Sequence, residues 1–400
     1  MFRSCNAFAP DLNDRSHEFL PTMQHFLLAF SVCLLAACQA QPPQAVGALP
    51  VAPTPRLLEE VFLSKDNVYA TQAQSAFESL SDAQRVAQLI MTTGGRLGKS
   101  QEEIKGLVRD QIVGGSIYLA NELEDHRSQV AEVNAVGEAD GVMPGLWFAI
   151  DAEPSLMHRR ILGGPNVTPA ADMTSDAEVK AAAKTIDSLI SDLGYHWNYA
   201  PVLDLGTENA AIKNRSFGRD GQLVAERAIT YVNQTQADGI VACIKHFPGH
   251  GLVDGDTHKG SVYITGEFQE YDVYERVLAK ADPLSLMVGH ITIEDNAYAT
   301  DGLPASLSRR INTDLIRDKL GYPGIVVTDA LNMMAAATKY GPTAPLMASK
   351  AGADVILMPA DERLTHRMIL EEMAKDSAYR AQVYASVDRV LRVKAWLGLL

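Results

Sequence analysis

Eight strand-length apolar runs, separated by helical stretches, limit the fold of this chain more than any other feature. They occupy residues 86–92, 112–119, 146–153, 196–205, 240–248, 284–291, 324–331 and 353–359. Most are continuously apolar rather than alternating, which is the pattern of strands covered on both faces. Helix start and stop signals lie between the runs, most clearly in 175–194, 266–282 and 308–321. The first run is ambiguous with a helix, because the residues SDAQ just before it also form a helix start.

The alternation predicts an α/β fold with a single domain, a (β/α)₈ barrel. An open, doubly wound sheet has the same alternation, and periodicity alone does not exclude it. A second pattern favours the barrel, because active sites of barrel enzymes lie at the carboxyl ends of the strands. Ionisable residues that are unexpected in apolar runs gather at those ends, namely Asp151, Asp204, Lys245, His290 and Asp329.

The N-terminal residues are typical of a targeting signal. The run FLLAFSVCLLAA, residues 26–37, has the length of a signal-peptide core and is too short to span a bilayer comfortably. It ends in LAAC, which resembles a bacterial lipobox whose cysteine, Cys38, becomes the lipidated first residue. We therefore interpret 1–37 as a signal peptide, 38–55 as a Pro-rich tether and 56–400 as the folded domain. The alternative is an ordinary cleaved signal with a chance cysteine.

These features predict a protein of the bacterial cell envelope, held at the outer membrane or on the periplasmic face only by its lipid anchor. The net charge of −14 argues against a nucleic-acid partner, whose phosphates need basic patches. The four cysteines match neither a zinc site nor a disulfide framework, and Cys243 sits in an apolar run as a small buried residue. We expect a monomer without metal or organic cofactor.

The segment KHFPGHGLVDGDTH, from Lys245 to His258, concentrates ionisable groups at the end of one apolar run. A metal site would use His246, His250 and His258, but no ligand set of familiar spacing is present. A solvated loop is a second interpretation, although it does not explain charged residues emerging from a buried strand. The third is acid/base catalysis, in which Asp256 orients the His258 ring and stabilises its protonated form.

This segment resembles the signature of glycoside hydrolase family 3 β-N-acetylglucosaminidases, and the resemblance extends over residues 80–360. It implies a barrel enzyme that removes terminal β-linked N-acetylglucosamine with retention of configuration. It also implies that His258 is the general acid/base and Asp256 its partner. Lys245 and His246 would bind sugar hydroxyls.

Three further segments support the resemblance. GYPGIVVTDALNM resembles the segment that supplies the nucleophile, here Asp329, for which a helix N-cap is the structural alternative. FAIDAEPSLMHR implies that Asp151 holds substrate hydroxyls and that Arg159 contacts the substrate. NRSFG makes Arg215 another contact. Because a nearby cation lowers the pKa of a carboxyl group, we expect Lys245 to lie near Asp329 and keep it ionised.

One segment departs from the family pattern of Asp-Gln-Glu followed by two glycines. The sequence here is Asp151-Ala152-Glu153-Pro154-Ser155, and proline fixes φ and removes a donor, so the loop must run differently. The expected substrates are peptidoglycan-derived muropeptides or chitooligosaccharides, and the expected role is peptidoglycan turnover or envelope glycan processing. A phosphorylase, a β-glucosidase and a non-catalytic glycan-binding lipoprotein remain alternatives.

Overall fold

The computed structural model describes residues 56–141 and 143–400. They belong to a compact unit that runs from Thr54 to Leu400. The predicted signal peptide, Cys38 and the tether lie outside the described residues, so they stay predictions. No helix in the described part of the chain is both long and apolar enough to cross a membrane.

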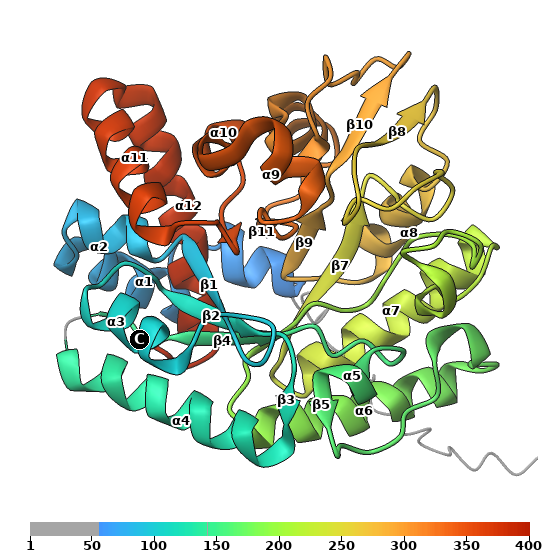
Figure 1. Cartoon of the computed structure of the whole chain (residues 1–400), viewed down its shortest axis with the longest axis horizontal. Helices are drawn as coiled ribbons and strands as arrows, with labels where there is room; N and C mark the ends of the chain where they lie inside the picture. The colour runs from blue at the N-terminus through green and yellow to red at the C-terminus, as the bar shows by residue number, and fades with distance from the viewer. Residues whose placement is uncertain (1–55, 142) are drawn as a thin grey trace, which may run out of the picture. The chain divides into compact units, whose positions relative to one another are not determined.

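Eight parallel strands form one sheet in the order β11-β9-β7-β6-β4-β2-β1-β12 (Figure 1). An isolated parallel bridge between Val327 and Val355 connects its two edges, so the sheet closes into a barrel. The predicted (β/α)₈ barrel is therefore confirmed, and the open-sheet alternative is wrong. Each of the eight apolar runs contributes one strand. The strands are β1 (Ile90–Gly94), β2 (Gly115–Tyr118), β4 (Trp147–Ile150), β6 (Trp197–Asn198), β7 (Val241–Phe247), β9 (Ser285–Val288), β11 (Ile325–Thr328) and β12 (Ile356–Leu357).

Helices surround the barrel, and several begin where the sequence places a capping residue. Ser81, Ser100 and Ser175 each form a capping box at the start of a helix. The α-helices are α1 (Val68–Ser79), α2 (Asp82–Ala87), α3 (Gln101–Arg109), α4 (Leu123–Asp140), α5 (Met157–Arg160), α6 (Asp176–Asp192), α7 (Gly221–Ala237), α8 (Tyr271–Lys280), α9 (Met334–Tyr340), α10 (Ala344–Ala351), α11 (Glu362–Lys375) and α12 (Ser377–Trp396). Shorter or irregular turns are η1 (Glu59–Leu63), η2 (Ala170–Asp172), η3 (Lys213–Arg215), η4 (Ala305–Leu307), η5 (Arg310–Lys319) and η6 (Gly341–Thr343).

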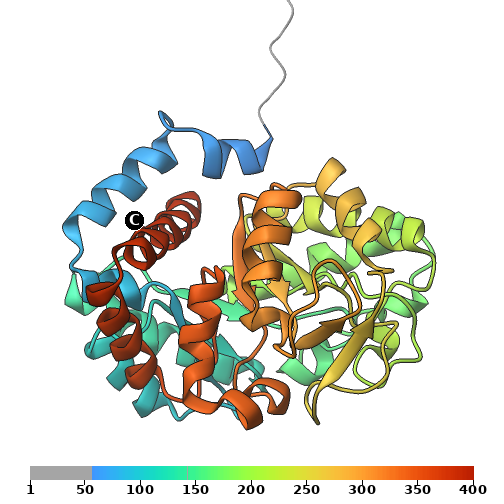
Figure 2. The same ribbon diagram turned by 90° about the horizontal axis from the view of Figure 1, so that it is seen from above.

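The three predicted helical segments correspond to α6, α8 and η5. The ambiguous first run divides between two elements, because the capped helix α2 occupies residues 82–87 and the strand starts at Ile90. The two ends of the unit meet on the outside of the barrel, where α1 and α12 lie side by side (Figure 2). Phe77 and Tyr384 join these helices through an edge-to-face ring contact at 5.1 Å.

The barrel core is built from the large side chains of the strands. Trp147 and Trp197 are fully buried, with ring centroids 4.6 Å apart, so both indoles belong to the core. A Cβ on Gly115 would lie 2.2 Å from the Trp147 ring, so only glycine leaves room for this indole. Cys243 is buried and unpaired, as its apolar surroundings predict.

Two short parallel strand pairs were not predicted. β8 (Val262–Thr265) pairs with β10 (Ile291–Glu294), and β3 (Asn121–Glu122) pairs with β5 (Ile161–Leu162). β10 follows β9 closely, so the β8–β10 pair extends the barrel at its carboxyl end (Figure 1). The pair fixes the far end of residues 248–261, the loop that leaves β7 and carries His258.

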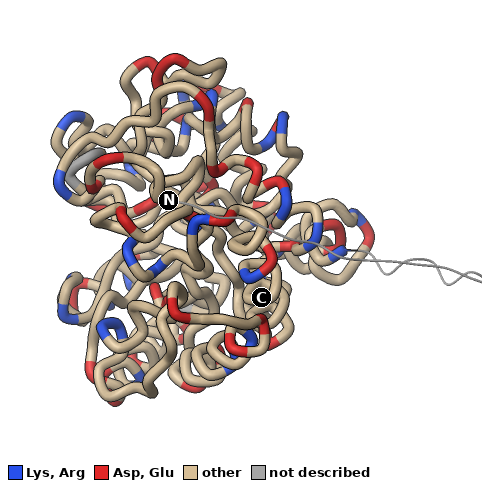
Figure 3. The backbone as a smooth tube through the Cα atoms, turned by 90° about the vertical axis from the view of Figure 1, so that its right-hand side faces the viewer, with Lys and Arg blue, Asp and Glu red and all other residues tan. Residues whose placement is uncertain are grey.

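Charged residues of both signs are distributed along the described part of the backbone (Figure 3), but Asp187 on α6 is fully buried. Neither of its carboxylate oxygens has a good hydrogen bond among the described residues, although Thr235 on α7 faces it. Burial therefore raises the pKa of Asp187 to about 7. The raised value means that the folded protein favours the protonated form.

We predict that Asp187→Asn flattens the dependence of stability on pH. The free energy of unfolding of the wild type should fall as pH rises from the ordinary aspartate pKa toward about 7, because the folded state then retains a proton that the unfolded state has lost. The slope should approach roughly 1.4 kcal/mol per pH unit inside that window. Urea unfolding between pH 4.5 and 8 measures it, with the exposed Asp176→Asn on the same helix as control. Equal slopes in wild type and Asp187→Asn would contradict the prediction.

Candidate active site

A cavity of about 550 Å³ opens at the carboxyl end of the barrel. Every predicted site residue within the described part of the chain lines it: Asp151, Arg159, Arg215, Lys245, His246, Asp256, His258 and Asp329. They come from the ends of several different strands and from the loops that follow. The fold therefore brings together side chains that lie far apart in the sequence.

Lys245 is the centre of a buried ionic cluster. Its ammonium group contacts Asp151 and lies 2.6 Å from Glu153. Arg215 binds both oxygens of Glu153 at 2.7 Å, and Arg160 lies 2.5 Å from Asp151. Burial opposes the charge of Lys245, but the two carboxylates outweigh it and raise its pKa above the ordinary value. Burial also works against the Asp151 carboxylate, yet Lys245, Arg160 and Arg215 hold its pKa well below the usual range.

Arg160 pairs with Asp151, whereas the exposed Arg159 side chain lines the cavity, so its expected contact with the substrate stays a prediction. The expectation that Lys245 keeps Asp329 ionised needs correction. Lys245 forms its ion pairs with Asp151 and Glu153, and the groups that most lower the pKa of Asp329 are His290 and His246. The physical reason is that the Lys245 side chain is only 2% exposed and two carboxylates from the β4 end meet its ammonium group there.

Asp329 follows β11 and is held ionised by other groups. Burial alone would raise its pKa, but the neighbouring His290 and His246 rings and the amide of Ala330, which donates to Oδ1 at 2.8 Å, lower it below the ordinary value. The next helix, α9, has Met333 as its N-cap residue. The N-cap alternative for Asp329 is therefore wrong, and its carboxylate faces the cavity.

Asp204 orients His246 from beneath the cavity. This fully buried carboxylate accepts a hydrogen bond from His246 Nδ1 at 2.6 Å and another from the amide of His250 at 2.7 Å. On the other side of the ring, Arg215 donates to Nε2 at 3.3 Å. These partners assign the His246 tautomer that carries its proton on Nδ1.

His290 supports the site in a similar way. Its Nε2 donates to the carbonyl oxygen of Ala330 at 2.9 Å, and Ser306 Oγ donates to its Nδ1 at 2.7 Å. The ring therefore fixes the backbone next to Asp329. The contacts of Asp204 and His290 make both of them supports for the groups that line the cavity.

Asp256 and His258 form a hydrogen-bonded pair, as their spacing of two residues predicts. His258 Nδ1 donates to Asp256 Oδ1 at 2.8 Å, and the His258 amide donates to the same oxygen at 3.0 Å. Burial would raise the pKa of Asp256, but these two hydrogen bonds and the charge of His258 lower it. The His258 side chain is 61% exposed, so its other ring nitrogen is free to meet a ligand in the cavity.

A buried carboxyl group fixes the start of this loop. Glu270 Oε1 accepts hydrogen bonds from the amides of Leu205 at 2.6 Å and Gly251 at 3.0 Å, and so joins the loops after β6 and β7. Burial, reinforced by the nearby Asp204, raises the pKa of Glu270 to about 8. A Cβ on Gly251 would lie 1.9 Å from the Leu205 carbonyl oxygen, so this approach requires glycine.

The three histidines of the segment have separate partners. His250 Nε2 lies 3.1 Å from Thr257 Oγ1, His246 is bonded to Asp204, and His258 to Asp256. Within residues 56–141 and 143–400, no group of three or more histidine, cysteine, aspartate or glutamate side chains is placed to hold a metal ion.

The segment after Asp151 differs from the family pattern, and Ser155 connects it to the rest of the site. Its hydroxyl donates to the carbonyl oxygen of Asn214 at 2.6 Å and accepts from the amide of Ala170 at 3.0 Å. Glu153, which no prediction included, thereby stays beside Arg215. The consecutive Arg159 and Arg160 were a sequence signal for a carboxylate partner. The sequence alone does not tell which of the two side chains turns inward.

Comparison with known proteins agrees with the architecture. Residues 82–393 match the model of the glycosyl hydrolase family 3 N-terminal domain, so the chain belongs to this family. It is 30% identical over 315 residues to a β-hexosaminidase of Stenotrophomonas maltophilia, covering 75% of this chain and 87% of that protein. It is 27% identical over 331 residues to β-hexosaminidase A of Pseudoalteromonas piscicida, covering 74% of this chain.

A similar solved structure is that of a glycoside hydrolase family 3 β-N-acetylglucosaminidase from Paenibacillus sp. FPU-7. The TM-score is 0.71 at 29% identity, and the match covers 80% of this chain and 63% of that one. The chain also spans only 55% of the Pseudoalteromonas protein. The likeness therefore covers only part of the length of these two proteins.

We predict that Glu270→Ala loosens the loop of residues 248–261, because it leaves two buried amides without an acceptor. The variant should lose about 1–3 kcal/mol of stability. Proteolysis within the loop should be faster. Glu270→Gln should stay close to wild type at pH 6, where the native carboxyl group is protonated. Thermal unfolding and limited proteolysis measure both effects, with the exposed Glu267→Ala as control. An Ala variant that is as protected as wild type would show that the loop does not depend on this carboxyl group.

Proposed function

We propose that the protein is a retaining exo-β-N-acetylglucosaminidase that removes terminal β-linked N-acetylglucosamine from small glycans. The observation that carries the proposal is the position of Asp329 and the Asp256–His258 pair around one cavity, in a chain that belongs to glycosyl hydrolase family 3. The names of the similar β-hexosaminidases support the choice of sugar.

In the proposed mechanism, Asp329 attacks the anomeric carbon and forms a glycosyl-enzyme. His258, protonated while its Nδ1–H is held by Asp256, gives its other ring proton to the leaving oxygen. The neutral ring then accepts a proton from the attacking water, and the glycosyl-enzyme is hydrolysed. The lowered pKa values of Asp329 and Asp256 support these roles, because both carboxylates have to be ionised.

Substrate binding is assigned to the charged groups around the ionic cluster. Asp151, Lys245 and His246 would hold sugar hydroxyls, and Arg159 and Arg215 would contact the glycan. Charged donors and acceptors form short, directional hydrogen bonds that select among hydroxyl arrangements. The substrates we propose are muropeptides released from peptidoglycan or chitooligosaccharides.

The central test compares hydrolysis of a chromogenic β-N-acetylglucosaminide by wild type, Asp329→Ala and His258→Ala. General acid/base catalysis contributes roughly 10²–10⁴-fold, so His258→Ala should lose activity in that range and Asp329→Ala at least as much. Azide should restore turnover of Asp329→Ala and yield the α-glycosyl azide. The exposed His158→Ala serves as the matched control.

The same assay separates the alternatives. A phosphorylase would form sugar 1-phosphate only when phosphate is present, and a β-glucosidase would prefer the glucoside. An inactive wild type on both substrates would favour the glycan-binding lipoprotein. Folding of every variant is checked by circular dichroism.

We also propose that Cys38 is lipidated and anchors the protein in the bacterial envelope. This proposal rests on the apolar run and the LAAC segment of the sequence. Expression with an alkyne-labelled fatty acid should label the wild type and place it in the membrane fraction, while Cys38→Ala should be unlabelled. Equal labelling of Cys38→Ala would refute the anchor, and Cys33→Ala controls for the other cysteine of the run.

A further inference from the structure

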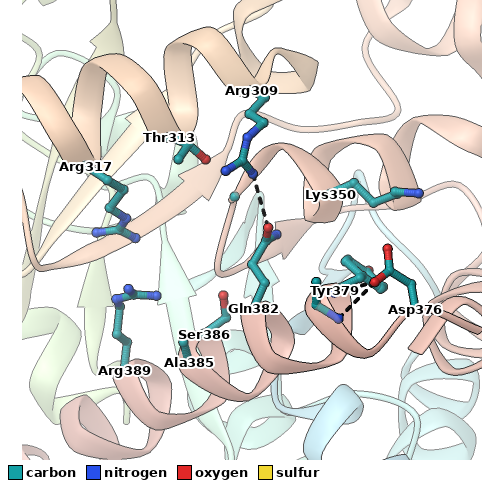
Figure 4. A pocket seen from close by; sticks show the side chains of 12 residues that line it. Arg309, Thr313, Arg317, Lys350, Asp376, Tyr379, Gln382, Ala385, Ser386 and Arg389 are labelled. Carbon is teal, nitrogen blue, oxygen red and sulfur yellow. Dashed lines mark hydrogen bonds between the residues drawn. The ribbon is translucent and has the colours of Figure 1, made fainter. Parts of the chain in front are cut away.

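A second cavity, of about 700 Å³, lies among the outer helices between η5, α10 and α12 (Figure 4). Arg317 in its lining donates to the carbonyl oxygen of Gly324 and contacts Asp354. Gly324 directly precedes β11 and Asp354 lies two residues before β12, whereas Asp329 follows β11. The second cavity is therefore at the amino ends of the strands, away from the candidate active site.

The lining of this cavity is positively charged, in a chain whose net charge is −14. It holds the basic side chains Arg309, Arg317, Lys350 and Arg389 and one acidic side chain, Asp376. The Asp376 carboxylate caps α12 by accepting from the amides of Ala378 and Tyr379, and it keeps its negative charge. Lys350 also has a partner, Glu372, at 2.6 Å.

The four basic side chains outnumber by one the three carboxylates beside them, Asp354, Glu372 and Asp376. Asp354 is fully buried and is shared by two guanidinium groups, Arg317 and Arg389, with Arg389 Nη1 at 3.1 Å. Burial and the nearby charge of Arg389 lower the pKa of Arg317, although Asp354 works in the opposite direction. One carboxylate cannot neutralise two guanidinium groups, and Arg309 adds a further positive charge without an acidic partner among the described residues.

Two of these arginines keep free donors. Arg309 uses only Nη1, which donates to Gln382 at 3.4 Å, and Arg389 uses only Nη1 toward Asp354. Their other guanidinium N–H groups have no partner within the described ranges. Ser386 lies between Gln382 and Arg389 on the same face of α12, and its hydroxyl also has no partner there (Figure 4).

We propose that this cavity binds a phosphate group, as inorganic phosphate or as the phosphate of a small monoester. Guanidinium groups bind oxyanions through pairs of parallel hydrogen bonds. Two separate arginines and a hydroxyl suit a tetrahedral dianion better than a planar carboxylate, because its oxygens point in several directions. The volume leaves room for an organic group beside the phosphate. The site is separate from the proposed glycosidase chemistry.

Calorimetric titration of the full-length protein with inorganic phosphate and with glucose 6-phosphate tests the proposal at low ionic strength. The wild type should bind at least one of them, and Arg309→Gln should weaken binding about tenfold or more, the effect of losing one charge-assisted hydrogen bond. Arg309→Gln,Arg389→Gln should abolish it. Arg310→Gln, the adjacent arginine outside the cavity, should bind as wild type does.

The two ligands distinguish the sources, since tighter binding of glucose 6-phosphate assigns the site to monoesters and equal binding assigns it to free phosphate. Gluconate, which carries a carboxylate on a similar skeleton, should bind at least tenfold more weakly. No binding of either phosphate ligand, equal loss in Arg309→Gln and Arg310→Gln, or gluconate binding as tightly as glucose 6-phosphate would overturn the proposal. Arg309 is exposed, so Arg309→Gln keeps the test valid if the double variant does not fold.

Discussion

The candidate site depends on the ion pairs that the buried ammonium group of Lys245 forms. A charge that emerges from a fully buried strand is tolerated only when carboxylates meet it, and Asp151 and Glu153 do so from the end of β4, which β6 separates from the Lys245 strand β7. Arg215 then binds Glu153 and reaches His246, which Asp204 orients from below. Each group thus fixes the next one. Removal of one member would leave an unpaired buried charge beside several others, so these residues act as a unit.

Much of the fold followed from the sequence because buried parallel strands have a simple signature. Runs that are apolar on both faces predicted all eight strands, and the serine capping boxes marked several helix starts. The helix–strand boundary near Ala87 was missed because apolar residues there suit both elements. The β8–β10 pair was missed because strands of four residues at the edge of a loop carry little periodicity.

The site was predictable from the sequence where the interacting residues are close together in the chain. It was less predictable where they are far apart in the chain. The contact between Asp256 and His258 follows from a spacing of two residues. The partners of Lys245 lie elsewhere in the chain, and only the folded strands decide that they are Asp151 and Glu153 rather than Asp329. The same limit applies to Arg160, because neighbouring arginines on a short helix differ only in the direction that each side chain takes.

The closure of the barrel has a consequence for the order of folding. β1 pairs with β12, and Ile90 is aligned with Ile356, so the strands that complete the ring come from opposite ends of the domain. The packing of α1 against α12 repeats this connection in the outer layer. A growing chain therefore cannot close its barrel until nearly all of it is available, and the last step is a contact of high sequence separation. Until then the first strand keeps an unpaired edge, which makes the incomplete chain the state most exposed to aggregation.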